Sequence, residues 1–313
     1  MTKHKEIEWV CFECAALRDM FIPAGHIATC NVSICDICGE EKEVTEPRDF
    51  GRLQSRINAK IRSMKKTLFI GDIHGNKDWE ETSNFALMRF TNVVFLGDYL
   101  DSFWIKSYDQ IKNLKNIIAL KKKYPDKITL LLGNHDYAYM FNYFLTVGFN
   151  AVYQHDFREI LKDNWDLFDI AWGYQGEKKY HLATHAGLTN YFYKQLVKEI
   201  ENSKTVMHDF FQEMEESEKK KWNELPLHEL LNYFKDKPSV LWKIGMMRQG
   251  SSLTGSILWA DKYELLQDSY KGIDQIVGHT PSNYPEARKT KDDNLYFIDS
   301  WQNRGVSSML IEM

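Results

Sequence analysis

The sequence predicts an α/β domain that follows a small cysteine-rich module. From Thr67 onward the chain carries short, nearly continuous apolar runs that end in Gly, Asp, Asn or His, as is typical of strands buried on both faces. Helical stretches, for example residues 110–123, lie between several runs, and this alternation indicates an α/β sheet. All five cysteines fall before residue 39, so we expect them to share one site in a separate module.

The apolar runs locate the expected strands, which are residues 68–70, 93–96, 128–132, 181–184, 275–277 and 295–298. Residues from about 190 to 250 are rich in aromatic residues, Lys and Glu, and are predicted to form a helical insertion, a cap or lid, between two strands. Functional side chains are expected at the carboxyl ends of the strands, because ligands bind at that edge of α/β sheets.

Length and composition exclude several classes of protein. The 313 residues suffice for one large domain with a small appendage, and 43% hydrophobic with 27% charged residues is a globular composition. No apolar run approaches the roughly 18 to 20 residues of a membrane helix, and the first residues do not read as a secretory signal. We therefore expect a cytoplasmic protein without a membrane partner. The net charge of −4 does not by itself favour a polyanionic partner.

Five polar motifs directly follow apolar runs: Gly71-Asp72-Ile73-His74-Gly75, Gly97-Asp98-Tyr99-Leu100-Asp101, Gly133-Asn134-His135-Asp136, Thr184-His185-Ala186-Gly187 and Gly278-His279-Thr280-Pro281. One such motif alone is more simply a turn, but five in order predict a shared site. Asp, His and Asn without thiolates suit Mn²⁺, Fe or Zn²⁺. A carboxylate such as Asp98 can bridge two ions, and two ions about 3.5 to 4 Å apart clamp an in-line displacement at phosphorus.

This ordered set resembles the calcineurin-like metallophosphoesterases, and most closely their phosphoprotein phosphatase branch with its bacterial and phage members and the symmetrical diadenosine tetraphosphatases. The resemblance covers residues 67–313 and implies a two-sheet α/β/β/α sandwich with a binuclear site at one edge. It implies one metal on Asp72, His74 and Asp98, and a second on Asp98, Asn134, His185 and His279. It further implies His135 as general acid, Asp101 as the residue that orients its imidazole, and a metal-bridging hydroxide as nucleophile.

One motif departs from the family pattern. The family's second motif continues Asp-Arg-Gly, and its arginine binds the substrate phosphate, whereas this chain has Asp101-Ser102-Phe103. Arg248 is expected to compensate, because it precedes residues 256–261, which resemble the segment after a second phosphate-binding arginine of the family. The missing arginine bears on specificity for phosphoproteins more than on hydrolysis itself.

The cysteines predict a zinc-ribbon-like module over residues 1–47. Cys11-x₂-Cys14 and Cys35-x₂-Cys38 lie twenty residues apart, close to the spacing of structural zinc sites, and redox or reactive thiols are the alternative. Gly39 suits the tight turn around a thiolate-bound ion, whereas Cys30 and His26 are spare donors. A segment this short needs a metal to hold a core.

Charge separates this module from a basic linker, residues 48–66. Residues 1–47 carry four Lys/Arg and nine Asp/Glu, whereas residues 48–66 carry seven Lys/Arg and one Asp. A spacing of four places Arg48, Arg52, Arg56 and Lys60 on one stripe of a helix. A solvated linker helix is the simpler interpretation, and a stripe that contacts the phosphates of a nucleic acid is the alternative.

The leading hypothesis is a metal-dependent phosphoesterase acting on a phosphorylated substrate, most simply a phosphomonoesterase of the protein phosphatase type. We expect two divalent ions (Mn, Fe or Zn) at the catalytic site and one structural Zn in the module. A nucleotide or polynucleotide phosphatase, or a dinucleoside polyphosphate hydrolase, is the alternative within enzymes. A metal-binding scaffold on a phosphoesterase fold is the alternative of another class, and the intact pair of His135 and Asp101 argues against it.

Overall fold

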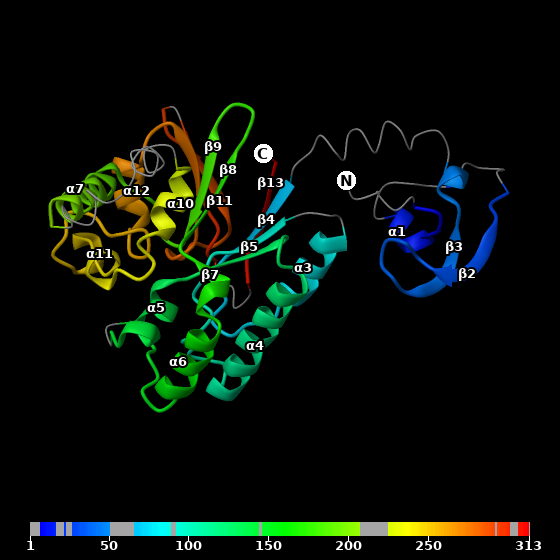
Figure 1. The fold of residues 1–313 in the computed structure, drawn as a ribbon, viewed down its shortest axis with the longest axis horizontal. Coiled ribbons are helices and arrows are strands. Elements are labelled where there is room, and N and C mark those ends of the chain that lie inside the picture. The colour runs from blue at the N-terminus through cyan, green and yellow to red at the C-terminus, as the bar shows by residue number, and fades with distance from the viewer. Residues whose placement is uncertain are drawn as a thin grey trace.

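The computed structural model describes residues 7–16, 22, 27–50, 66–88, 92–143, 146–206, 225–291, 293–300 and 306–312. These residues form two five-stranded sheets with helices packed around them, and a separate three-stranded sheet near the N-terminus (Figure 1). The described helices include none that is both long and apolar enough to span a membrane.

The first large sheet has the strand order β13-β4-β5-β6-β7. Its strands are β4 (Lys66–Ile70), β5 (Asn92–Phe95), β6 (Ile128–Leu131), β7 (Phe168–Asp169) and β13 (Ser308–Glu312). Strands β4 to β7 run parallel, and β13 pairs with β4 in antiparallel orientation. The three expected strands of this part of the chain are therefore present at β4, β5 and β6.

The second large sheet has the order β11-β12-β10-β9-β8. Its strands are β8 (Ala171–Gln175), β9 (Tyr180–Thr184), β10 (Ile273–Val277), β11 (Glu286–Lys289) and β12 (Asn294–Phe297). The central strands β9, β10 and β12 run parallel, and the edge strands β8 and β11 pair with them in antiparallel orientation.

The helices lie between the strands along the chain and on the outer faces of the sandwich (Figure 1). The first group consists of α3 (Trp79–Met88), α4 (Ser107–Lys123), α5 (Asn134–Phe141), α6 (Gln154–Asp163) and the 3₁₀ turn η2 (Trp165–Leu167). The described part of the expected insertion holds α7 (Asn190–Val206), α10 (Leu227–Asn232), α11 (Pro238–Leu241) and the 3₁₀ turn η3 (Met246–Arg248). Helix α12 (Lys262–Asp268) follows it.

Alternating side chains of the strands build the layers of the sandwich. On β4, Leu68 and Ile70 belong to a core shared with α4 residues such as Leu114. The intervening Phe69 packs in a different core that includes Ile276 of the second sheet. Successive side chains of a strand point to opposite faces, so both faces of this sheet are covered. This packing confirms the predicted two-sheet sandwich.

The N-terminal module has a sheet of order β1-β3-β2 and a core of its own. Its elements are β1 (Val10–Cys11), α1 (Phe12–Ala16), β2 (Cys30–Ile34), β3 (Glu41–Thr45) and the 3₁₀ turn η1 (Pro47–Phe50). Phe50 is buried in this core, so the module extends past the predicted boundary at residue 47.

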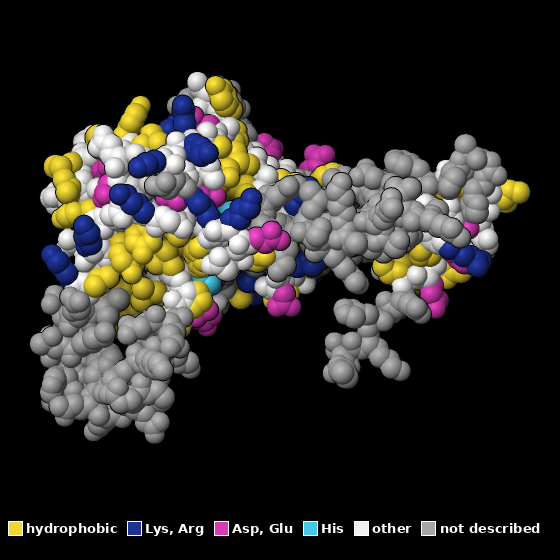
Figure 2. All heavy atoms as spheres, turned by 90° about the horizontal axis from the view of Figure 1, so that it is seen from above, with side chains coloured by type: hydrophobic (Ala, Val, Ile, Leu, Met, Phe, Trp, Pro, Cys, Tyr) yellow, Lys and Arg dark blue, Asp and Glu magenta, His cyan; other side chains and the backbone are white. Residues whose placement is uncertain are grey.

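The predicted basic stripe lies mostly outside the described residues. Arg52, Arg56 and Lys60 are not among the described residues, and neither is His26 of the module. Arg48 is described in η1, where its guanidinium pairs with the carboxylate of Glu46 at 2.5 Å. Elsewhere, Lys and Arg side chains are dispersed among apolar ones on the face seen in Figure 2 rather than gathered in one stripe.

Candidate functional site

The predicted metal ligands from both sheets converge on two groups that share one carboxylate. Asp72, His74 and Asp98 form the first group, and Asp98, His185 and His279 form the second, with potential ligand atoms within 4.8 Å of one another in each. Asn134 joins the second group, because its Oδ1 lies 3.0 Å from His185 Nε2. All six side chains therefore meet, although they come from five separate loops.

The Asp98 carboxylate lies at the centre of this arrangement. Its Oδ2 is 3.4 Å from His185 Nε2 and 3.9 Å from the Nε2 atoms of both His74 and His135. Burial alone would raise the pKa of Asp98, but the imidazoles of His185 and His135 outweigh burial and hold this pKa well below its ordinary value. Asp98 is therefore an anion in position to bridge two cations.

Two imidazoles are oriented by backbone carbonyls. His74 Nδ1 lies 2.7 Å from the carbonyl oxygen of Leu100, and His185 Nδ1 lies 2.8 Å from that of Leu96. A carbonyl oxygen only accepts, so each Nδ1 carries the hydrogen and each Nε2 faces Asp98. This arrangement is typical of metal-binding histidines, whose second nitrogen donates to a protein oxygen.

Buried polar groups in the centre favour bound cations. His279 Nε2 is buried and has no hydrogen-bond partner among the described residues. Burial, His185 and Arg248 together hold the pKa of His279 well below its ordinary value, so its ring stays neutral and can act as a ligand. Burial, followed by the neighbouring Asp299, raises the pKa of Asp72 well above the usual range. Divalent cations would relieve the crowding of these carboxylates, so the residues present fit a pair of metal ions.

Four of these functional residues have a backbone conformation that L-residues seldom adopt. The φ angles are +40° at His74, +51° at Asp98, +67° at Asp101 and +64° at His279. Such left-handed residues cost roughly 1 kcal/mol each, and unfavourable backbone conformations cluster at functional sites. The strand ends therefore turn sharply, and the turns direct the side chains towards the centre.

Two glycines permit the close approach of the second and third motifs. Gly97 has a φ of +106°, and a Cβ atom there would lie 2.4 Å from the backbone nitrogen of Gly133. A Cβ atom on Gly133 would lie 2.0 Å from Asp98 Oδ1. Because neither glycine has a Cβ atom, the two motifs approach closely, and Asp98 Oδ1 accepts a hydrogen bond from the backbone N–H of His135 at 3.0 Å.

The predicted acid and its orienting carboxylate are in direct contact. His135 Nδ1 lies 2.8 Å from Asp101 Oδ2. Burial would lower the pKa of His135, but Asp98 and Asp101 outweigh burial and raise it. Tyr139, which the sequence analysis missed, donates its hydroxyl hydrogen to Asp101 Oδ1. The available signal was its spacing of four from His135, which places both residues on one face of α5.

Arg248 lies beside the second ligand group. Its Nη2 donates to the hydroxyl of Thr280 at 2.7 Å, next to His279, and its Nε lies 2.9 Å from Asp261 Oδ2. Ser102, at the position of the missing arginine, instead stabilises its own loop, because its hydroxyl accepts the backbone N–H groups of Trp104 and Ile105 at 3.3 and 3.2 Å. Of these two residues, only Arg248 brings a positive charge near the centre.

A second candidate metal site lies in the N-terminal module. The sulfur atoms of Cys11, Cys14, Cys35 and Cys38 lie within 4.8 Å of one another, whereas Cys30 is exposed and outside the group. Burial raises the pKa of the Cys35 thiol, but backbone N–H groups, chiefly that of Cys11, outweigh burial and bring it to about 7. Four convergent thiols with N–H groups directed at sulfur suit a tetrahedral ion.

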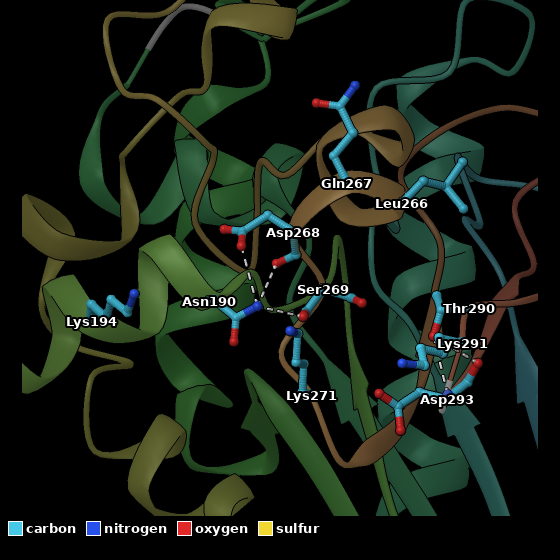
Figure 3. A pocket seen from close by; sticks show the side chains of 10 residues that line it. All are labelled: Asn190, Lys194, Leu266, Gln267, Asp268, Ser269, Lys271, Thr290, Lys291 and Asp293. Atoms are coloured by element: carbon cyan, nitrogen blue, oxygen red, sulfur yellow. Dashed lines mark hydrogen bonds between the residues drawn. The ribbon is translucent and has the colours of Figure 1, made fainter.

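A pocket of about 480 Å³ lies between the start of α7, the end of α12 and the β11–β12 turn (Figure 3). None of the predicted site residues lines it. Asn190 donates to the carbonyl of Ser269 at 2.7 Å, and Asp268 accepts the N–H of Tyr191 at 2.8 Å. These polar groups therefore connect α7 to α12.

Sequence comparisons relate the chain to phosphatases. The family model of the calcineurin-like phosphoesterases matches residues 65–283. A putative serine/threonine-protein phosphatase of Schizosaccharomyces pombe is 41% identical over 79 residues, 24% of either chain. A catalytic subunit of protein phosphatase 2A from Dictyostelium discoideum is 32% identical over 107 residues, 33% of this chain and 32% of that protein. The aligned part of the chain thus spans 24% and 32% of the length of these two relatives.

Two solved phosphatase structures match the chain at low sequence identity and with TM-scores below 0.5. A cold-active protein-tyrosine phosphatase of a psychrophilic Shewanella species has 15% sequence identity and a TM-score of 0.46, over 93% of this chain and 92% of that chain. A serine/threonine phosphatase of Saccharomyces cerevisiae has 12% identity and a TM-score of 0.42, over 77% and 69% of the two chains. At these scores neither structure adds to what the family match establishes.

Proposed function

The chain belongs to the calcineurin-like phosphoesterase family and is a hydrolase, and we propose that it removes phosphate from monoesters in the manner of the phosphoprotein phosphatases. The observation that carries the proposal is the arrangement around Asp98, which is shared by two ligand groups and faces His135 at 3.9 Å. This arrangement supports the proposal, because His135 acting as a general acid would lie beside two cations that hold a phosphate.

In this proposal Asp72, His74 and Asp98 hold one divalent ion, and Asp98, Asn134, His185 and His279 hold the other. The ions, when bound, supply Lewis acidity that activates water and neutralises phosphate charge. Burial would lower the pKa of His185, but the negative charge of Asp98 outweighs burial and raises this pKa to about 9. The same negative charge would stabilise a bound cation.

His135 acts in the proposal as the general acid for the leaving oxygen. Its Nδ1 is held by Asp101 at 2.8 Å, so its Nε2 faces the centre and can donate a proton. Asp101 stabilises the imidazolium and fixes the ring. Arg248, adjacent to the second ligand group, orients a phosphate oxygen, because a guanidinium binds phosphate with high geometric specificity.

The four clustered cysteines are proposed to hold one structural zinc ion. The alternative use of the basic linker in nucleic-acid binding finds no support in the described residues, since Arg48 is paired with Glu46. Oligonucleotide substrates are therefore a competing outcome of the test rather than a second proposal.

The test is phosphate release with Mn²⁺ from p-nitrophenyl phosphate, a phosphopeptide and oligonucleotides phosphorylated at either end. Diadenosine tetraphosphate is included in the same panel, and its nucleotide products are measured separately. We expect the phosphopeptide to be the best substrate. His135→Asn should reduce turnover by about 10² to 10⁴-fold while metal content is unchanged. His155→Asn, an exposed histidine on α6, is the matched control and should turn over normally.

Three results would contradict the proposal. Normal turnover by the His135→Asn variant would show that His135 is not the general acid. A preference for oligonucleotides or for diadenosine tetraphosphate would replace the phosphoprotein-type substrate with a nucleotide. Metal binding without turnover of any substrate would favour the scaffold hypothesis.

A further inference from the structure

Three apolar side chains are exposed on two loops that meet at Asp101, the residue that contacts His135. Phe103 and Trp104 follow Asp101 in the loop between β5 and α4 and are 60% and 74% exposed, and Val147 of the loop after α5 is 71% exposed. We propose that these three side chains, here called the apolar lip, bind an apolar or aromatic residue that flanks the phosphorylated residue of a peptide substrate. This inference rests on the proposed function and specifies its substrate.

The two loops of the apolar lip adjoin each other at Asp101. A Cβ atom built on Gly148 would lie 3.1 Å from the carbonyl oxygen of Asp101 and 3.4 Å from the Phe103 ring. The side-chain amide of Asn150 also donates to the hydroxyl of Ser107 at 2.8 Å, which joins the loop after α5 to the start of α4. The loop that carries Val147 is therefore in contact with the loop that carries Phe103 and Trp104.

The backbone beneath the rings is held in place. The hydroxyl of Ser102 accepts the N–H groups of Trp104 and Ile105. The side chain of Gln110, which is buried, accepts from Ser102 N at 3.2 Å and donates to Ile105 O at 2.7 Å. The exposed rings thus project from a fixed loop, and a preformed apolar surface binds with a small entropic cost.

The position of the general acid indicates which part of a substrate contacts the apolar lip. A general acid must reach the leaving oxygen, so the leaving group lies on the side of His135. Asp101 contacts His135, and the apolar lip adjoins Asp101. The group attached to the leaving oxygen therefore extends over the apolar lip, whereas Arg248 lies at Thr280, next to the ligand His279.

The chemistry of the apolar lip favours a peptide. Its members are a phenyl ring, an indole and an isopropyl group, which gain free energy by covering apolar surface and offer no pair of donors and acceptors for the edge of a base. Two peptide sources share this chemistry: a phosphoserine flanked by an aromatic residue, and a phosphotyrosine, whose own ring is the leaving group. A nucleobase stacked on Trp104 is the competing outcome.

The test uses the full-length protein with Mn²⁺ and three phosphopeptides of otherwise identical sequence. The first has phosphoserine flanked by Phe, the second phosphoserine flanked by Gly, and the third phosphotyrosine flanked by Gly. We expect kcat/KM for the Phe-flanked peptide to exceed that for the Gly-flanked phosphoserine peptide by about tenfold. A higher value for the phosphotyrosine peptide than for both others would contradict the assignment to a flanking residue, because the apolar lip would then bind the ring of the leaving group itself.

The variant Phe103→Ala/Trp104→Ala should remove this preference by raising KM for the favoured peptide, while turnover of the Gly-flanked phosphoserine peptide is retained. Phe103→Leu/Trp104→Leu keeps apolar area and should restore part of the preference. Phe85→Ala, a partly exposed phenylalanine on α3, is the matched control and should preserve it.

Three further outcomes would overturn the inference. The first is equal kcat/KM for all three peptides in the wild-type protein. The second is an unchanged preference in the Phe103→Ala/Trp104→Ala variant. For the third, adenosine 5′-monophosphate is assayed beside the peptides: if the same variant loses turnover of this nucleotide alone, the surface binds a nucleobase. If no phosphopeptide is hydrolysed while p-nitrophenyl phosphate is, the proposed phosphoprotein-type function fails, and the inference fails with it.

Discussion

At the scale of single residues, the proposed general-acid pair of His135 and Asp101 depends on a third side chain. The Tyr139 hydroxyl donates to Asp101 and accepts the backbone N–H of Asn150 at 2.8 Å. Its ring stacks on Phe149 with centroids 4.5 Å apart and is fully buried. Burial, followed by the charge of Asp101, raises the pKa of Tyr139, so the hydroxyl keeps its proton and remains a donor. Tyr139 therefore orients the carboxylate that orients His135.

Replacement of Tyr139 by Phe should lower kcat for a phosphoserine peptide by about tenfold, because a hydrogen bond to a charged group contributes about 1.5 to 3 kcal/mol. Turnover of p-nitrophenyl phosphate should change less, since a good leaving group needs less protonation. Steady-state kinetics with both substrates measures the difference. Tyr153→Phe is the control, because no hydrogen bond of its hydroxyl is found among the described residues. An equal loss with both substrates would show that Tyr139 has only a structural role.

The sequence predicted the residues that meet around Asp98 but not Tyr139, for a physical reason. The ligands sit in short motifs directly after apolar runs, and parallel strands bring the ends of such runs to one edge. The spacing of four from His135 places Tyr139 on the same face of α5, but it does not identify Asp101, which lies 38 residues earlier in the chain, as its partner. That contact depends on how α5 packs against the β5–α4 loop, so the role of Tyr139 follows from the tertiary structure.

At the scale of elements, the predicted strands were those buried on both faces. Strand β10 is buried at every position, and β5 at all but its first. The strands of the sandwich that the sequence analysis missed are short or lie at sheet edges: β7 has two residues, β8 is mostly half-buried, β11 is mostly exposed, and β13 lies beside β4 at the edge of the first sheet. Such strands are not covered on both faces over their length, so they lack the continuous buried run by which the other strands were predicted.

The turn between β6 and α5 requires a glycine at position 133. Gly133→Ala places a Cβ atom 2.0 Å from Asp98 Oδ1, so the β6–α5 turn or the Asp98 carboxylate must move. We expect a fall of about 2 kcal/mol or more in the free energy of unfolding, as for other overpacked buried sites, together with weaker Mn²⁺ binding. Denaturant unfolding and metal titration measure the two effects.

Gly272→Ala is the matched control for that substitution. Gly133 has a φ of −97°, whereas Gly272 has a positive φ of +83°, and a Cβ atom on Gly272 meets nothing within 4 Å. Its cost should be limited to the backbone strain of about 1 to 2 kcal/mol, with metal affinity unchanged. Unaltered Mn²⁺ affinity in the Gly133→Ala variant would contradict the view that the turn sets the position of Asp98.

At the scale of the whole molecule, the two candidate metal sites belong to parts of the protein with distinct apolar cores. The apolar core of the module consists mainly of Val10, Ala15, Val44 and Phe50 together with three of its cysteines, and it shares no residue with the cores of the sandwich. So few buried side chains supply little hydrophobic stabilisation, whereas the sandwich is large enough to fold on apolar burial. Metal removal should therefore affect the two parts differently.

Cys35→Ser should release the ion of the module and unfold the module, because binding free energy at such a site is folding free energy. Metal analysis should show one equivalent of zinc fewer, and limited proteolysis should cut within residues 1–50. Hydrolysis of p-nitrophenyl phosphate with Mn²⁺ should be unchanged, since Asp98 and its partners belong to the other core. Cys30→Ser is the control, because Cys30 is exposed and lies outside the thiol group. A parallel loss of turnover in the Cys35→Ser variant would show that the module supports the catalytic site. An unchanged zinc content in this variant would show that the clustered cysteines do not bind zinc.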